Sequence, residues 1–320
     1  MKIRSIAMFL IAAESLLLAR QQVPAAELFG AGVFSTGAYE LPPSFDLDGR
    51  RAWFTVSTPQ YGRKRWIMES RLTPSGWSAP TVAAFSGDFD DADPYVSPDG
   101  SKLFFLSKRP VTPGGAPKRD FDIWVMDRAG DQWGSPRHLG ALANGNSDEH
   151  YVTSTRGGSL VIAAVRPDSR NLGDLYEVPF EGGTYGEPRN LGPAVNAPET
   201  HETTPWVSPD GSYIIFASRG RQDTQGDMDL YVTRRDSSGA WGRPVNLGPT
   251  VNSRAADYCP LVSPDGKYLY FSSTRGFLEA PPARPTARQL LDQLSSPGNG
   301  LGDTWRVPMS EVRRIAGIPG

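Results

Sequence analysis

The sequence is poor in the residues that build disulfide frameworks and common catalytic sites. Its 320 residues include one cysteine, Cys259, and three histidines. A lone thiol cannot form an internal disulfide, so we expect Cys259 to fill core volume. The chain has no Gly-x-Ser-x-Gly elbow and no phosphate-binding glycine loop, which excludes a serine hydrolase domain of the elbow type and a nucleotide site of the loop type.

Basic clusters are absent as well. The chain carries 33 Lys and Arg against 35 Asp and Glu, for a formal net charge of −2, and the charges are well mixed. Proteins that bind nucleic acid usually gather lysine and arginine on one face. The sequence therefore predicts no nucleic-acid partner.

Residues 1–26 differ from the rest of the chain. Lys2 and Arg4 precede a mostly apolar stretch over 6–18, and small residues follow at Ala25 and Ala26. This order is typical of a cleaved secretory signal, and the apolar stretch is shorter than the roughly 20 residues that span a bilayer. We expect a periplasmic or secreted protein with no membrane span. Removing 1–26 takes away three basic residues and one acidic residue, so the formal charge falls from −2 to −4.

One phrase, Ser-Pro-Asp-Gly, recurs along the chain. It stands at 97–100, 208–211 and 263–266, and degenerate copies stand at 46–49 and 154–157. Aligned on the residue before the last glycine, at positions 48, 99, 156, 210 and 265, the copies are 51, 57, 54 and 55 residues apart. Such a regular interval predicts a repeat architecture.

Each repeat reads as four short strands. In the fourth copy, apolar and β-branched runs at 201–209 and 213–218 flank an Asp-Gly turn, which is a strong hairpin signal. Further strands are predicted at 229–233 and 240–247, the last with a proline that is typical of an edge strand. Four antiparallel strands per repeat is the plan of a propeller blade.

Five copies predict an all-β fold with a single propeller of five four-stranded blades over 27–320. A sixth blade is the alternative, but no sixth phrase is found. The last repeat ends after its third strand, near Met309. We therefore expect residues 27–35 to supply its missing outer strand, so that the two ends of the chain close the ring and leave no open edge.

The repeats resemble a known family. The Ser-Pro-Asp-Gly turn, the apolar strand that ends in Ser-x-Arg, and the Asp-hydrophobic-Trp/Tyr strand at 122–124, 174–176 and 303–305 are similar to the WD40-like PD40 repeat of TolB-type propellers, over about 37–310. The resemblance implies the propeller fold and, by analogy, partner recognition at the cell envelope. Propellers of this type serve many roles, so the resemblance does not fix the function.

The fifth repeat carries an insertion over about 275–302. A proline-rich lead is followed by a segment in which Thr286 can cap a helix. Leu290, Leu291 and Leu294 then form a narrow apolar stripe with helical spacing. The insertion is either a loop packed on its own blade or a lid or partner-docking helix.

Patterned charge gathers at one predicted end of the blades. Eight residues before each aligned turn position stands an acid, where the first strand of a blade begins. These acids are Glu40, Asp91, Asp148, Glu202 and Asp257. The second strand ends at the same face with Arg109, Arg166, Arg219 and Arg275. The sequence predicts a ring of acids and arginines around one mouth of the central channel.

Two interpretations of this ring remain open. Each acid can pair with the arginine of its own blade as a structural device, or the ring can form a polar funnel for a cation, sugar or peptide. Glu40 is the odd member, because blade one has no aligned arginine. His150 and His201 fall near the same mouth without zinc-like spacing, so no metal or cofactor is predicted, and calcium in the channel stays an alternative.

Two functions follow from these observations. The first is an exported, non-catalytic binding or scaffold propeller, monomeric, with a protein, peptide or glycan ligand at the cell envelope. The second is a glycan-active hydrolase in which Glu40, Glu202, Asp91 and Asp148 would do the acid and base work.

Overall fold

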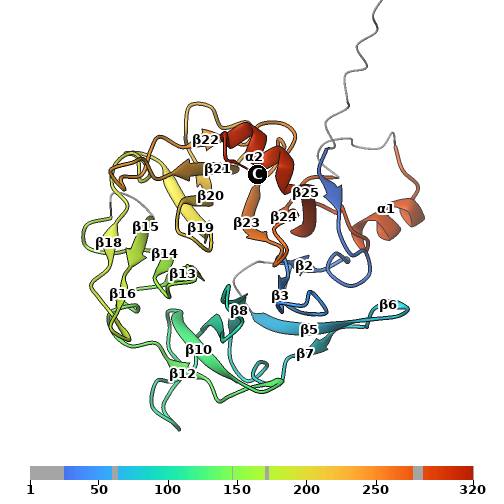
Figure 1. Ribbon diagram of the computed structural model, residues 1–320. Helices are drawn as coiled ribbons and strands as arrows, with labels where there is room; N and C mark the ends of the chain where they lie inside the picture. The colour runs from blue at the N-terminus through green and yellow to red at the C-terminus, as the bar shows by residue number, and fades with distance from the viewer. Residues whose placement is uncertain (1–24, 60–63, 146, 170–172, 277–283, 320) are drawn as a thin grey trace, which may run out of the picture.

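Five antiparallel sheets surround a central axis in the computed structural model of the chain (Figure 1). The structure describes residues 25–59, 64–145, 147–169, 173–276 and 284–319. Each sheet corresponds to one repeat, which confirms the five-bladed propeller. The expected signal sequence falls almost wholly outside the described residues.

In every blade the second strand lies between the first and the third. The first strands, in blade order, are β2 (Tyr39–Glu40) with β3 (Ser44–Phe45), β8 (Asp91–Val96), β13 (Glu149–Ser154), β19 (His201–Val207) and β23 (Asp257–Val262). The second strands are β4 (Arg51–Ser57), β9 (Lys102–Ser107), β14 (Leu160–Ala164), β20 (Tyr213–Arg219) and β24 (Tyr268–Ser273). The third strands are β5 (Arg65–Thr73), β10 (Asp122–Ala129), β15 (Asp174–Val178), β21 (Asp229–Arg234) and β25 (Asp303–Pro308).

The fourth strand is broken at its proline. Pieces on either side of that residue pair separately with the third strand or with each other. They are β6 (Gly76–Trp77) and β7 (Thr81–Val82), β11 (Gln132–Trp133) and β12 (Arg137–His138), β17 (Thr184–Tyr185) with β16 (Phe180–Glu181) and β18 (Arg189–Asn190), and β22 (Val245–Asn246). Proline cannot donate to a ladder, so the outer edge of each blade is short and interrupted.

The core lies between the blades, where the second strands are apolar on both faces. All five residues of β14 are buried, and so are the last five of β9. Burying a leucine, isoleucine or phenylalanine contributes roughly 1.5–3 kcal/mol, so these strands hold neighbouring blades together. Cys259 is buried as predicted.

A repeated bulge bends the first strand of four blades. Two residues after the opening acid, the backbone takes a positive φ at Asp93, Tyr151, Thr204 and Cys259, and the strand register shifts there. A bulge of this kind bends a strand and increases its twist. Thr204 Oγ1 accepts the Cys259 N–H at 3.0 Å, so the bent strands of blades four and five are tied to one another.

The two ends of the chain close the ring, as predicted. Strand β1 (Glu27–Leu28) pairs antiparallel with β25 and becomes the outer strand of blade five. The Ser35 hydroxyl then accepts a hydrogen bond from the Thr304 N–H at 3.0 Å. Asn252 Oδ1 accepts a hydrogen bond from the Leu230 N–H in the same way, at 2.8 Å, at the junction between blades four and five. The closing junction therefore repeats a contact that the continuous chain uses elsewhere.

Two helices decorate the propeller. Helix α1 (Ala287–Leu294) lies in the predicted insertion, and Thr286 caps it. Helix α2 (Met309–Ala316) follows β25 directly and buries Met309 and Val312. The sequence reasoning missed α2. Within the described residues, neither helix is long or apolar enough to cross a bilayer.

The turn of blade three corrects the sequence alignment. In the other blades the turn ends on a positive-φ glycine, at Gly49, Gly100, Gly211 and Gly266. In blade three that residue is Gly158, with φ of 93°, and its N–H donates to Thr155 O at 3.1 Å. The turn is therefore Thr155-Arg156-Gly157-Gly158, one residue later than predicted, because two adjacent glycines made the degenerate phrase ambiguous.

This register gives a direct prediction. A Cβ on Gly158 would lie 2.6 Å from Phe180 Cδ1 in a left-handed backbone, whereas a Cβ on Gly157 would meet only Thr155 Oγ1 at 3.7 Å. We expect Gly158→Ala to lower the free energy of unfolding by about 1–3 kcal/mol and Gly157→Ala to leave it within about 1 kcal/mol. Urea unfolding of both variants measures this, and a larger loss for Gly157→Ala would contradict the register.

Candidate functional site

The opening acids of the five blades are buried at the strand ends. Their residues are 0–1% exposed, and they are Glu40, Asp91, Glu149, Glu202 and Asp257. Four of these match the prediction. In blade three Asp148 was wrong, because the true turn begins one residue later and places Glu149 at the equivalent position. Asp148 instead accepts the Phe121 N–H at 2.7 Å.

Arginines pair with four of these acids. Arg109 Nη2 lies 3.0 Å from Asp91 Oδ1, and Arg275 Nη2 lies 2.6 Å from Asp257 Oδ1. Arg166 Nη2 is more distant, at 3.8 Å from Glu149 Oε1, and donates to Ala143 O at 2.9 Å. The arginines reach the acids of their own blades, as the structural interpretation requires.

Blade four uses a different arginine from the predicted one. Arg221 Nη2 lies 2.7 Å from Glu202 Oε1, and Arg221 Nε donates to Ser218 Oγ at 2.9 Å. Arg219 points to the surface, where it pairs with Asp227 at 2.6 Å, and both side chains are more than half exposed. The prediction of Arg219 was wrong, because strand β20 continues through Arg219, whereas β9 and β24 end at Ser107 and Ser273, the equivalents of Ser218.

Burial raises the pKa of several of these carboxyls. Burial is the largest cause for Glu149, whose pKa rises to about 8 even though Arg166 lowers it, and the pKa of Glu202 is also raised by burial. Low dielectric disfavours the charged form of a buried carboxyl, and a paired arginine opposes this effect. The four pairs hold strand ends together, and a ligand-binding role for them stays a prediction.

Glu40 is the exception that the sequence indicated. Its carboxylate accepts hydrogen bonds from the Thr36 hydroxyl and, at 3.3 Å, from the Thr36 N–H, and no described arginine or lysine pairs with it. Burial, together with the nearby Asp303, raises the pKa of Glu40 to about 7. Asp303 is fully buried, and burial raises its pKa to about 6. Two carboxyls therefore meet where the ring closes.

The two histidines near this end are half-buried. Burial lowers the pKa of both His150 and His201, so each favours the neutral imidazole. No group of three or more His, Cys, Asp or Glu side chains within the described ranges is arranged to hold a metal ion.

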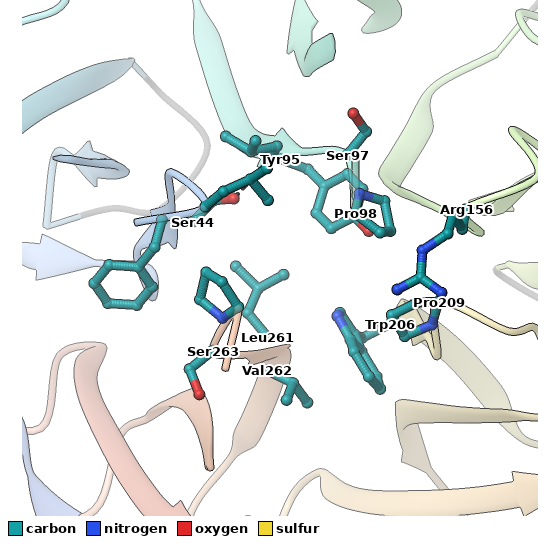
Figure 2. Close-up of a pocket in the computed structure, with 14 residues that line it drawn as sticks. Ser44, Tyr95, Ser97, Pro98, Arg156, Trp206, Pro209, Leu261, Val262 and Ser263 are labelled. Atoms are coloured by element: carbon teal, nitrogen blue, oxygen red, sulfur yellow. Dashed lines mark hydrogen bonds between the residues drawn. The ribbon is translucent and has the colours of Figure 1, made fainter. Parts of the chain in front are cut away.

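A pocket opens on the axis at the opposite end of the blades. Each first strand runs from its acid to its turn over about six residues, or roughly 20 Å, so the turns gather at the other mouth. The pocket has a volume of about 100 Å³ and takes lining residues from all five blades (Figure 2). The equivalent turn residues Leu47, Pro98, Arg156, Pro209 and Pro264 all line it.

The wall below these turns is apolar and uneven. Tyr95, Trp206 and Leu261 occupy equivalent positions in blades two, four and five, and Figure 2 shows them on different sides of the pocket. Tyr95 is fixed by its hydroxyl, which donates to Ser154 O at 3.1 Å. Because the blades differ here, the pocket has lost the symmetry that the buried ion pairs keep.

A groove adjoins the pocket between blades five and one. It has a volume of about 290 Å³ and shares Phe45, Leu47, Ser263 and Pro264 with the axial pocket. The rest of its lining is four aromatic rings, Phe29, Trp77, Tyr268 and Tyr270, together with Asp48, Gly49 and Asp265. The rings interlock, since Phe29 meets Tyr270 edge-on at 4.8 Å between centroids. The pocket and the groove form one depression on the turn face, with mostly apolar side chains and two carboxylates in the groove.

Helix α1 lies away from this depression, at the edge of the molecule in Figure 1. Leu290 is half-buried, whereas Leu291 is 64% and Leu294 is 49% exposed. Asn299, just beyond the helix, donates to Gly37 O at 3.2 Å and anchors the insertion to blade one. The predicted apolar stripe thus faces solvent, and its docking role stays a prediction.

Sequence reasoning missed the axial pocket because it followed charge. The signal was present in the turn phrase: Arg156-Gly157 stands where three other blades have Pro-Asp. When one turn near the axis of a propeller differs in sequence from the equivalent turns, its residues are not held by the structural role that the other turns share. The one-residue misalignment placed Arg156 at the aspartate position and hid the exchange.

Comparisons with known proteins give structural matches only. No family model and no curated protein matches the chain. A TolB structure from Agrobacterium tumefaciens is 22% identical over 74% of this chain and 70% of that chain, with a TM-score of 0.45. An alpha-L-arabinofuranosidase from Lactobacillus brevis is 13% identical over 86% and 91%, with a TM-score of 0.50. A puromycin-hydrolyzing peptidase from Mycobacterium tuberculosis is 15% identical over 73% and 34%, with a TM-score of 0.40.

At these identities the matches show the fold alone. What the sheets and the repeat phrase establish together is a five-bladed β-propeller.

Proposed function

We propose that this chain is an exported, non-catalytic propeller that acts as a binding or scaffold module at the cell envelope. The observation that carries the proposal is the axial depression, because side chains from all five blades meet there around an apolar wall. Concave apolar sites with a few polar groups are the usual form of a binding site. The recognition surface is therefore the turn face.

The scaffold around this surface suits recognition. Buried strands pack neighbouring blades together, and buried ion pairs tie the strand ends within four of the blades. A rigid scaffold holds the turns in fixed positions, and a preorganised site loses less entropy on binding. Residues 1–26 have the order of a secretory signal, and the repeat resembles that of periplasmic TolB. Both features support a place outside the cytoplasm.

The alternative is a glycan-active hydrolase that uses the carboxylates at the other mouth. Such an enzyme needs an acid and a base that touch the substrate. Glu40, Asp91, Glu202 and Asp257 are 0–1% exposed, and the last three are paired with arginine. This geometry favours binding over hydrolysis.

The proposal is tested by capture from envelope extracts. Immobilised full-length chain is expected to retain a specific partner, and Trp206→Arg, which places a charge in the apolar wall, is expected to reduce retention about tenfold or more. Leu291→Arg, on the exposed face of α1, is the control and is expected to retain the partner. The absence of any specific partner would contradict the function, and loss with Leu291→Arg alone would move the surface to the insertion.

A further inference from the structure

The turn of blade three differs from the other four turns in the charge of its side chains. At the five equivalent positions on the axis, four blades present leucine or proline and blade three presents Arg156. At the next position, four blades have aspartate and blade three has Gly157. One exchange therefore removes an acid from the turn face and adds a cation to the pocket.

Arg156 has no evident structural task for its side chain. Its backbone N–H donates to Pro209 O at 2.7 Å and ties the turns of blades three and four. Its guanidinium makes no hydrogen bond or ion pair with the residues that the structure describes, and the residue is exposed at the pocket edge (Figure 2). By contrast, Arg275 is 8% exposed and donates to Ser273, Val251 and Asp257.

The serine hydroxyls of the pocket are already hydrogen-bonded, and the indole N–H of Trp206 is a further donor in its lining. Ser44 Oγ accepts the Val96 N–H at 2.9 Å. Ser97 Oγ donates to Asp99 at 2.5 Å, and Ser263 Oγ donates to Asp265 at 2.6 Å. A sugar carries a hydroxyl on most carbons and needs a partner for each, and few side chains of this lining remain to bond them. An apolar group that bears one carboxylate matches an apolar wall with one guanidinium.

The small size of the pocket favours the end of a bound peptide over an internal segment. Its volume of about 100 Å³ is about a third of that of the adjoining groove, at about 290 Å³. A terminal side chain with its carboxylate suits this space, whereas a strand that passes through does not. The shared residues Phe45, Leu47 and Pro264 lead outward into the aromatic groove, which can hold the preceding residues.

Resting on the proposed function, we propose that the axial pocket binds the C-terminal carboxylate of an extended peptide partner. Arg156 pairs with the carboxylate, the last side chain contacts Tyr95, Trp206 and Leu261, and the chain leaves through the groove between blades five and one. Specificity comes from the free carboxylate first and from an apolar last residue second.

The test uses an array of pentapeptides anchored by their N-termini, each with an apolar last residue and each made as the free acid and as the amide. A charged hydrogen bond contributes about 1.5–3 kcal/mol, so the full-length chain is expected to bind some free acids about tenfold or more tighter than their amides. Arg156→Leu is expected to abolish that difference, and Arg156→Lys to keep part of it.

Two controls accompany these variants. Leucine is the residue that blade one carries at the equivalent turn position, so Arg156→Leu is expected to fold, and its thermal unfolding checks this. Arg50→Leu removes an exposed arginine of the blade-one turn that does not line the pocket, and it is expected to bind like wild type.

Several results would overturn the inference. Equal binding of acids and amides, selection for internal acidic residues whatever the terminus, or Arg156-dependent binding of oligogalacturonate in place of peptides would each do so. Failure here is separable from failure of the proposed function. If the captured partner is lost with Trp206→Arg but kept with Arg156→Leu, the binding module stands and the carboxylate recognition falls.

Discussion

Replacing Arg221 by methionine is expected to lower the free energy of unfolding by about 3–5 kcal/mol, because it leaves the buried Glu202 without its counter-charge. The Arg221 side chain is 12% exposed, its guanidinium lies 2.7 Å from Glu202 Oε1, and it also donates to Val195 O and Ser218 Oγ. Methionine keeps much of the apolar stem but none of the donors. Urea unfolding at pH 7 measures the loss.

Arg219→Met is the matched control, two residues earlier in the same blade. Arg219 pairs with Asp227 at the surface, where an ion pair is typically worth about 0–1 kcal/mol. We expect a loss within that range. Equal losses for the two variants would contradict the assignment of Arg221 as the partner of Glu202. The double variant Arg221→Met with Glu202→Gln is expected to recover part of the loss, since the charge left behind is then gone.

Glu40→Gln is expected to stabilise the protein at pH 8. The pKa of Glu40 is raised from 4.5 to about 7 in the folded chain. Between these two pH values the folded state therefore holds a proton that the unfolded state has lost. Stability from this proton is therefore full below pH 4.5 and is lost as the pH rises from 4.5 through 7. Glutamine cannot ionise, so at pH 8 the variant is expected to exceed wild type by about 2–3 kcal/mol.

The difference between the two proteins isolates Glu40 from the other titrating groups. At pH 4 the free energies of unfolding are expected to agree within about 1 kcal/mol. Asp257→Asn supplies the control of opposite sign, because it occupies the same position in blade five and leaves Arg275 unpaired. A loss of stability for Glu40→Gln at pH 8 would show that a cation outside the described residues already neutralises Glu40.

The architecture was predictable because it depends on sequence features that recur from one repeat to the next. The turn glycine, the apolar second strand and the outer-strand proline recur in register, so an error in one copy is corrected by the others. Closure of the ring by residues 27–35 was predicted by counting the strands of each repeat. The pairing of Leu28 with Trp305 confirms it. Helix α2 carries no repeat signal, and its eight residues gave too short a pattern to recognise.

Individual partners were less predictable. Asp148 and Arg219 were predicted by alignment of the repeats. A one-residue slip in the turn moved the role of the acid to Glu149, and the longer strand β20 moved the role of the arginine to Arg221. Long side chains reach across several ångströms, so sequence position alone does not decide which arginine meets which acid. The axial pocket is harder still, since it exists only once five distant turns are brought together.

The seam at β1 has a consequence for biogenesis. Glu27 and Arg306 form an ion pair across 279 positions of chain, so strand β1 must stay unpaired until β25 has been synthesised. Four blades can assemble during that interval, but the fifth cannot be completed. The ring therefore locks only when β25 reaches the strand that has been waiting for it.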